Sequence, residues 1–83
     1  MNPDVILEAA NAVMPFGKHS GSKLLHIPEP YLVWLNKQGL PQGKLGQQLA
    51  LIYEVKLNGL ESLFITHNGS IQFQSNKPFK EGK

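Results

Sequence analysis

The sequence of 83 residues contains neither cysteine nor arginine. Without cysteine, disulfide bonds and thiolate metal sites are excluded. Without arginine, the chain lacks the planar guanidinium group that binds guanine or phosphate through two parallel hydrogen bonds, which disfavours sequence-specific recognition in the DNA major groove. Eight lysines and six acidic residues leave a net charge of +2. That charge alone does not decide the partner.

Long apolar runs are missing as well. No segment reaches the roughly 20 apolar residues that a membrane-spanning helix needs. The first residues carry Asp4 and Glu8, where a secretory signal would be positively charged. We therefore expect a cytoplasmic protein with no membrane contact. A hydrophobic share of 41% in a chain of this length predicts one small globular domain over residues 1–76, followed by a loose basic tail over residues 77–83.

Paired groups typical of catalytic centres are also absent. The three histidines, His19, His26 and His67, are far apart in the sequence, and no His-x-x-x-His pair has the spacing of a zinc site. Asp4 is the only aspartate, and the glutamates show no pairing of the kind that glycosidases or nucleases use. We expect no enzymatic activity, no cofactor and no metal; a hydrolase with a histidine-bound metal is a remote alternative.

Three helices are expected from capping residues and apolar spacing. The first starts at Asn2, and its apolar residues recur through Val13 before a proline ends it. The second starts at Pro28 and ends at Gly39. The third runs over residues 44–58, with a broad apolar stripe on one face.

Two β-hairpins are expected beside these helices. Residues 15–25 predict a tight hairpin in which Gly17 and Gly21 supply backbone conformations that other residues resist. Residues 63–74 predict two short strands around an Asn-Gly pair, which is a strong hairpin signal. The predicted fold class is therefore α+β: a small single domain of about three helices and two short hairpins.

The candidate binding surface is a basic stretch of the chain. No acidic residue occurs in residues 15–28, which hold two lysines and two histidines: Lys18, His19, Lys23 and His26. Backbone N–H groups and ammonium groups in a glycine-containing loop can hold an anion, although the spacing of a nucleotide-binding loop is missing. Alternatively, the glycines only permit a sharp hairpin and the lysines keep it solvated. For contact with a simple anion or a phosphate backbone, both interpretations stay open.

Phe16 lies within this stretch, and Tyr31 and Trp34 follow it in the sequence. Exposed aromatic rings beside lysines can stack unpaired bases, at about 1–3 kcal/mol per base. Tyr31 and Trp34 are, however, three residues apart on the second expected helix, a spacing typical of core residues. We therefore expect Trp34 to lie in the core, and Phe16, in the loop, to be partly exposed.

A family resemblance rests on motifs between residues 14 and 63. They are Met-Pro-Phe-Gly-Lys at 14–18, Tyr-Leu at 31–32, Trp-Leu at 34–35, Gly-Leu-Pro at 39–41, Gly-Lys-Leu-Gly at 43–46 and Lys-Leu-Asn-Gly-Leu at 56–60. This region resembles a family of short bacterial proteins of unknown function described as "putative quorum-sensing-regulated virulence factors". Residues 14–35 also resemble the C-terminal accessory module of exonuclease X-like DNA exonucleases, which implies a link to nucleic-acid handling without a catalytic centre. Where such modules commonly have Tyr-Lys-Gly after the first lysine, this chain has His19-Ser20-Gly21.

Together these features predict a small non-enzymatic binding module that contacts a polyanion, such as single-stranded DNA or RNA, through the loop at residues 16–23. The predicted binding residues come from this loop and the following helix: Phe16, Gly17, Lys18, His19, Gly21, Lys23, Tyr31 and Trp34. The alternative is a protein-interaction or virulence-associated regulatory module that forms a homodimer. Leu51 and Val55 suggest an uncovered apolar face for it, because they lie off the main stripe of the third expected helix.

Overall fold

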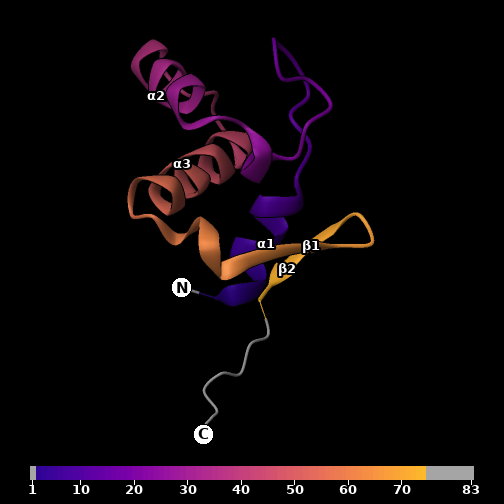
Figure 1. Ribbon diagram of the computed structural model, residues 1–83. Helices are drawn as coiled ribbons and strands as arrows, with labels where there is room; N and C mark the ends of the chain where they lie inside the picture. Colours follow the sequence, from indigo (N-terminus) through magenta and orange to yellow (C-terminus); the bar gives the residue numbers. More distant parts are fainter. Residues whose placement is uncertain (1, 75–83) are drawn as a thin grey trace, which may run out of the picture.

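The computed structural model describes residues 2–74, which form three α-helices and one antiparallel hairpin (Figure 1). In chain order the elements are α1 (Pro3–Asn11), the 3₁₀ helix η1 (Leu24–His26), α2 (Glu29–Gln38), α3 (Lys44–Leu57), the 3₁₀ helix η2 (Leu60–Leu63), and the strands β1 (Phe64–His67) and β2 (Ser70–Phe73). The α+β class predicted from the sequence is confirmed. The predicted domain end at residue 76 and the basic tail at residues 77–83 lie outside the described residues.

Helix α1 begins where the sequence predicts but ends earlier. Asn2 caps it, because its side-chain oxygen accepts a hydrogen bond from the backbone N–H of Asp4 at 2.8 Å. The last helical residue is Asn11, and the next residue has an extended backbone with a ψ of 146°. Val13, expected on the apolar face of the helix, is instead 55% exposed and forms an isolated β-bridge with Lys23. That expectation was wrong because the helix has already ended and the chain forms a loop. The residues on either side of Val13 make backbone hydrogen bonds to residues 22 and 24 on the other side of this loop.

Helices α2 and α3 end at glycines, as the sequence indicates. Gly39 follows α2 with a φ of 105°, and Gly59 comes shortly after α3 with a φ of 67°. In the first turn of α3, Gly46 is buried against the connector between the two helices: a Cβ atom at this position would lie 1.7 Å from the carbonyl oxygen of Pro41. Only glycine lets the connector cross α3 at this distance.

Helix α3 is the centre of the packing. It contacts α1 and α2, and Figure 1 shows it between α2 on one side and α1 with the hairpin on the other. The largest fully buried side chains come from all parts of the described chain: Met14, Leu24, Ile27, Leu32, Leu49, Ile52 and Ile71. Each such side chain contributes roughly 1.5–3 kcal/mol of transfer free energy on burial. The core therefore joins to the helices both the hairpin and the base of the basic loop, which we define as residues 12–23 between α1 and η1.

The hairpin at residues 64–73 agrees with its prediction. Asn68 and Gly69 have φ values of 53° and 78°, as a two-residue type I′ turn requires. The register pairs Phe64 with Phe73, and their rings stack with centroids 5.1 Å apart. Ile71 is 1% exposed while its neighbours along β2 are exposed, which is the alternation expected of a half-buried strand.

The other predicted hairpin, at residues 15–25, does not form strands. The bridge between Val13 and Lys23 joins its two sides, and the intervening residues form turns. Gly17 and Gly21 have φ values of 79° and 91°, so these glycines do supply left-handed conformations. The segment lacks the β-branched residues that favour strands and is rich in glycine and serine, which favour turns.

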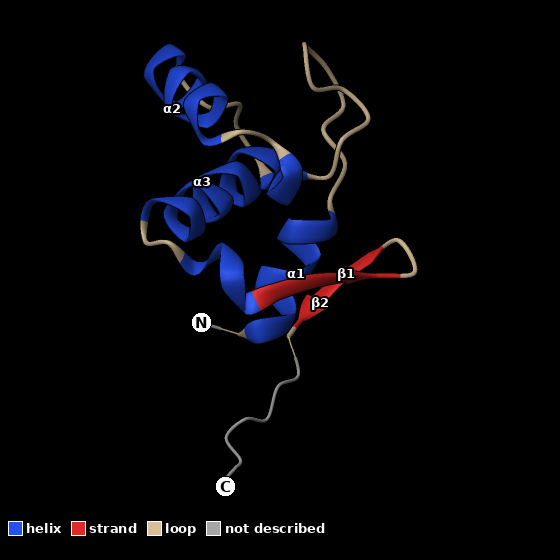
Figure 2. Cartoon of the chain, in the orientation of Figure 1, coloured by secondary structure: helices blue, strands red, loops and turns tan. Residues whose placement is uncertain are grey.

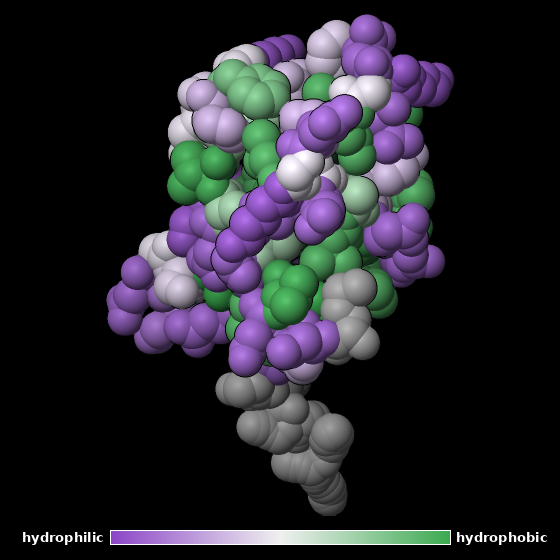
Figure 3. All heavy atoms as spheres, turned by 180° about the vertical axis from the view of Figure 1, so that it is seen from behind, coloured by the Kyte–Doolittle hydropathy of each residue, from purple (hydrophilic) through white to green (hydrophobic). Residues whose placement is uncertain are grey.

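The apolar face expected on α3 for self-association is not exposed. Val55 is 6% exposed and belongs to the core, and Leu51 is half-buried against the core. This expectation was wrong because α3 is covered from more than one side. In the rear view of Figure 3, hydrophobic groups lie interspersed with hydrophilic ones. The large apolar side chains that are exposed among the described residues are Val5, Val13, Phe16, Trp34, Leu57, Leu60, Leu63 and Ile65.

Candidate functional site

The basic loop stands out from the body of the protein on a fixed base. In Figure 2 it is the long tan segment that follows α1 and projects beside α2. Its two sides are joined by three backbone hydrogen bonds of 2.8 Å: Met14 N–H to Ser22 oxygen, Gly21 N–H to Met14 oxygen, and Leu24 N–H to Ala12 oxygen. The side chain of Met14 is fully buried in the core. The loop is therefore anchored at its base, while its tip at residues 16–21 extends toward solvent.

Lys23 belongs to this anchored base and not to the exposed tip. Its half-buried side chain directs Nζ toward the body, where it donates to Oδ1 of Asn11 at 2.8 Å and to the carbonyl oxygen of Gly69. Lys23, a predicted binding residue of this loop, therefore does not present its ammonium group at the exposed tip. The physical reason is that the turn between β1 and β2 places a backbone acceptor within reach of the side chain.

Tyr31 connects the loop tip to α2. A Cβ atom at Gly17 would lie 3.0 Å from the Tyr31 hydroxyl oxygen, so the hydroxyl packs against the loop backbone. The rings of His19 and Tyr31 meet edge to face, with centroids 4.5 Å apart and an interplanar angle of 73°. The rings of Tyr31 and Trp34 follow with centroids 5.4 Å apart and an angle of 38°. We call these three residues the aromatic row.

The outer end of the aromatic row is accessible. Trp34 is 51% exposed, so the expectation that it lies in the core was wrong. The inward side of α2 is occupied instead by Leu32 and Leu35, which are buried, so Trp34 lies on the outer side of the helix. Phe16 is 45% exposed, which confirms its expected partial exposure. Two large rings are thus available to a partner near the loop.

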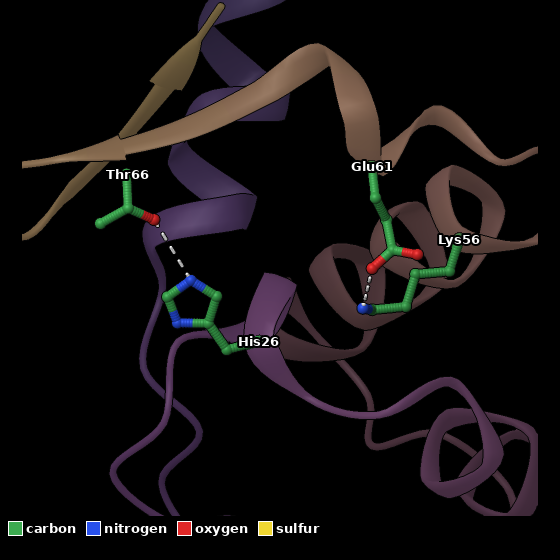
Figure 4. A network of polar contacts seen from close by, with 4 residues as sticks. All are labelled: His26, Lys56, Glu61 and Thr66. Atoms are coloured by element: carbon green, nitrogen blue, oxygen red, sulfur yellow. Dashed lines mark hydrogen bonds and ion pairs between the residues drawn. The ribbon is translucent and has the colours of Figure 1, made fainter.

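Two of the described lysines form ion pairs. Nζ of Lys44 lies 2.5 Å from Oε2 of Glu8 at an exposed position. Nζ of Lys56 lies 2.7 Å from Oε2 of Glu61, and the Lys56 side chain is only 5% exposed. Figure 4 shows the Lys56 side chain running back from the end of α3 to meet the glutamate of η2. In the sequence Lys56 looks like an ordinary surface lysine, and nothing there indicates its burial.

The remaining described lysines differ in what surrounds them. Lys23 is held by neutral oxygens, as described above. Lys18, in the loop tip, and Lys37, in the last turn of α2, are exposed, and neither makes an ion pair with a carboxylate within residues 2–74. Lys18 comes two residues after Phe16, and Lys37 comes three residues after Trp34. The sequence singled out Lys18 as a site residue but did not single out Lys37.

The histidines are not assembled into a metal site. His26 is exposed, and its Nε2 lies 3.4 Å from Oγ1 of Thr66 on β1 (Figure 4). His19 contacts Tyr31, and His67 ends β1 at the hairpin turn. Within residues 2–74, no group of three or more histidine, aspartate or glutamate side chains is placed to hold a metal ion.

Among the helices formed by the same residues, none combines the length and apolarity needed to cross a membrane.

An open hollow of about 720 Å³ lies between α1, α3 and β2. Its lining includes the Glu8–Lys44 ion pair and the side chains of Asn11, Gln48 and Gln72. Charges of both signs and several amides therefore share its wall. The predicted site residues do not line it, so the loop and the aromatic row form a separate surface.

Comparisons with known proteins place the chain among relatives of undefined activity. Residues 2–66 match the model of a family described as "Putative quorum-sensing-regulated virulence factor". The chain is 41% identical over 64 residues to the "Uncharacterized protein YpeB" of Escherichia coli K12, covering 76% of this chain and 89% of that protein. The protein of the same name from Escherichia coli O157:H7 matches equally. No solved structure matches the chain.

Proposed function

The chain belongs to the family that carries this virulence-factor description, and we propose that it acts as a module that binds single-stranded DNA or RNA. The binding surface consists of the loop tip and the aromatic row. One observation carries the proposal: the half-exposed ring of Phe16 lies in the same loop tip as Lys18, and the half-exposed ring of Trp34 is joined to that tip through Tyr31. The Lys18 ammonium group is not neutralised by a carboxylate among residues 2–74. Contact with a strand of this kind needs no catalytic residue.

The exposed rings favour unpaired bases over duplex. Base faces in a duplex are already stacked on one another, whereas those of a single strand can stack on protein rings at about 1–3 kcal/mol per base. Trp34 offers the largest ring for this purpose. Its ring packs against that of Tyr31, with the two centroids 5.4 Å apart. Without arginine in the chain, bidentate recognition of guanine by a guanidinium group is not available. Binding is therefore tolerant of sequence.

Lysine contacts set the strength and the salt dependence of this binding. A lysine that neutralises one phosphate of a single strand adds about 0.7 to the slope of log affinity against log salt. Lys18 supplies such a contact from the loop tip, and the turn around it is held by the Gly17 and His19 contacts with Tyr31. Because few lysines face this surface, we expect modest affinity at low salt. The sequence resemblance to exonuclease X-like accessory modules agrees with this proposal and stays a prediction.

Titration of the protein with short single strands at several salt concentrations tests the proposal. Trp34 is the only tryptophan of the chain, so its fluorescence reports directly on a base stacked against it. We expect quenching on addition of an oligonucleotide, weaker affinity in Lys18→Gln and Phe16→Ala, and little change in Lys44→Gln, a matched loss of charge at an ion-paired site. Absence of quenching at low salt, or equal losses in Lys18→Gln and Lys44→Gln, would contradict the proposal.

A further inference from the structure

We propose that Lys37 is an additional phosphate-binding residue and that the bound strand runs along α2, from the loop tip toward the end of this helix. The inference rests on the proposed function and adds a direction and a length to the site. It assigns a role to a lysine that neither the sequence motifs nor the loop geometry singles out.

The direction follows from the order of side chains along α2. The aromatic row starts at His19 in the loop and continues through Tyr31 to Trp34, with centroid separations of 4.5 and 5.4 Å. Lys37 comes three residues after Trp34 in the same helix, and residues at this spacing are neighbours on a helix surface. A strand stacked on Trp34 therefore has Lys18 on its loop side and Lys37 on its far side.

The charges of the described residues support this placement. Lys37 and Lys18 are exposed without carboxylate partners in residues 2–74, whereas Lys44 and Lys56 are neutralised by glutamates. Glu29, at the start of α2, is the acidic residue of this helix. It lies five positions before Trp34, about 140° away around the helix axis, and eight positions before Lys37, about 80° around the axis and about 12 Å along it. Glu29 is therefore at the opposite end of α2 from Lys37 and forms no ion pair with it.

The length of the site follows from helix geometry. Tyr31 and Lys37 are separated by six residues of α2, or about 9 Å along the helix axis. Nucleotides in a stacked strand are spaced by about 3.4 Å, so the part of the surface on α2 covers about three nucleotides. A hexanucleotide should therefore bind more tightly than a trinucleotide, because it can reach Lys18 in the loop tip as well as Lys37.

The experiment compares Lys37→Gln, Lys37→Arg and the control Lys44→Gln by salt-dependent fluorescence titration of Trp34 with oligothymidylates. For Lys37→Gln we expect the salt slope to fall by about 0.7, with unchanged quenching at saturation because the base still stacks. Lys37→Arg should restore the slope, since its charge is retained. Unchanged melting temperatures in the three variants would show that they are folded alike, and a melting loss in Lys37→Gln that matched its binding loss would overturn the inference.

The outcomes separate this inference from the proposed function. If Lys18→Gln lowers the slope but Lys37→Gln does not, the strand does not follow α2, and the inference fails while the proposed function stands. If a hexanucleotide binds no more tightly than a trinucleotide, the strand does not run from the loop tip along α2, and the inference fails. If the wild-type protein gives no quenching at low salt, or binds a duplex as tightly as a single strand of equal charge, both the inference and the proposed function are overturned.

Discussion

The side-chain amide of Asn11 forms two hydrogen bonds with the backbone of Ile71, 60 positions later in the chain. Nδ2 donates to the Ile71 carbonyl oxygen and Oδ1 accepts from the Ile71 N–H, both at 2.8 Å. The amide thereby satisfies the outer edge of β2 as a neighbouring strand would. The same Oδ1 accepts from Nζ of Lys23. One side chain thus holds together the end of α1, the hairpin and the base of the binding loop.

Replacing this amide should destabilise the whole domain. Asn11→Ala leaves both backbone groups of Ile71 without partners in a partly buried place, and we expect a loss of about 2–3 kcal/mol in the free energy of unfolding. Urea unfolding measures it. Asn58→Ala is the control, because the Asn58 amide bonds to Glu54 at an exposed position; its loss should stay below about 1 kcal/mol. Equal losses in the two variants would show that the Asn11 contacts do not join the elements.

Gly46→Ala should destabilise the protein although the change lies inside a helix. Alanine normally stabilises a helix interior by about 1 kcal/mol relative to glycine. Here the added Cβ would lie 1.7 Å from the carbonyl oxygen of Pro41, so the connector must move. We expect a net loss of about 3 kcal/mol from this overpacking. Thermal unfolding tests the sign of this stability change, with Gln47→Ala, at an exposed position of the same turn, as the control.

Removing Lys56 or Glu61 from their ion pair should change the free energy of unfolding by different amounts. Lys56→Met keeps the buried stem and removes the charge, and we expect stability to change by less than about 1 kcal/mol. Glu61→Ala leaves a buried ammonium group without its partner. Because the Glu61 side chain is 51% exposed, water reaches the site and limits the expected loss to about 1–2 kcal/mol. If Glu61→Ala were no more harmful than Lys56→Met in urea unfolding, the pair would not matter to folding.

Substitutions of Trp34 and Leu32, on the same helix, should affect binding and stability separately. Leu32 is 1% exposed and Trp34 is 51% exposed. Leu32→Ala should cost about 2–5 kcal/mol of stability through the cavity it leaves. Trp34→Ala should cost much less, yet it should weaken binding of a fluorescently labelled single strand. Strong destabilisation by Trp34→Ala would show that Trp34 contributes to folding as a core residue, as its spacing in the sequence predicts.

Local signals in the sequence predicted the three helices and the hairpin at residues 64–73, but not the end of α1 or the turns at residues 15–23. Asn2 caps α1, Gly39 and Gly59 lie where α2 and α3 end, and the Asn68-Gly69 pair makes the hairpin turn. Each of these features depends on residues within a few positions of one another. Capping and left-handed turns need only such neighbours, so the sequence indicates them directly.

The candidate site was only partly predictable, because its composition depends on contacts between distant segments. Phe16 and Lys18 are exposed as the loop pattern suggested. Lys23 is equally basic in the sequence, but Gly69, 46 positions later, supplies an acceptor that turns it inward. Trp34 has the spacing of a core residue, yet Leu32 and Leu35 fill the inner side of α2. Spacing along one helix does not say which side its neighbours will cover.

By itself the sequence determined the α+β class, the start of α1, the ends of α2 and α3, the hairpin turn and an acid-free basic loop, because each depends on short-range backbone preference or on composition. Tertiary structure alone decided which groups of that loop face solvent. Packing around α3 buried Val55 and Lys56, and the Asn11–Ile71 contact drew Lys23 to the hairpin. Exposure is a property of how elements pack against each other, and packing is set by residues far apart in the chain.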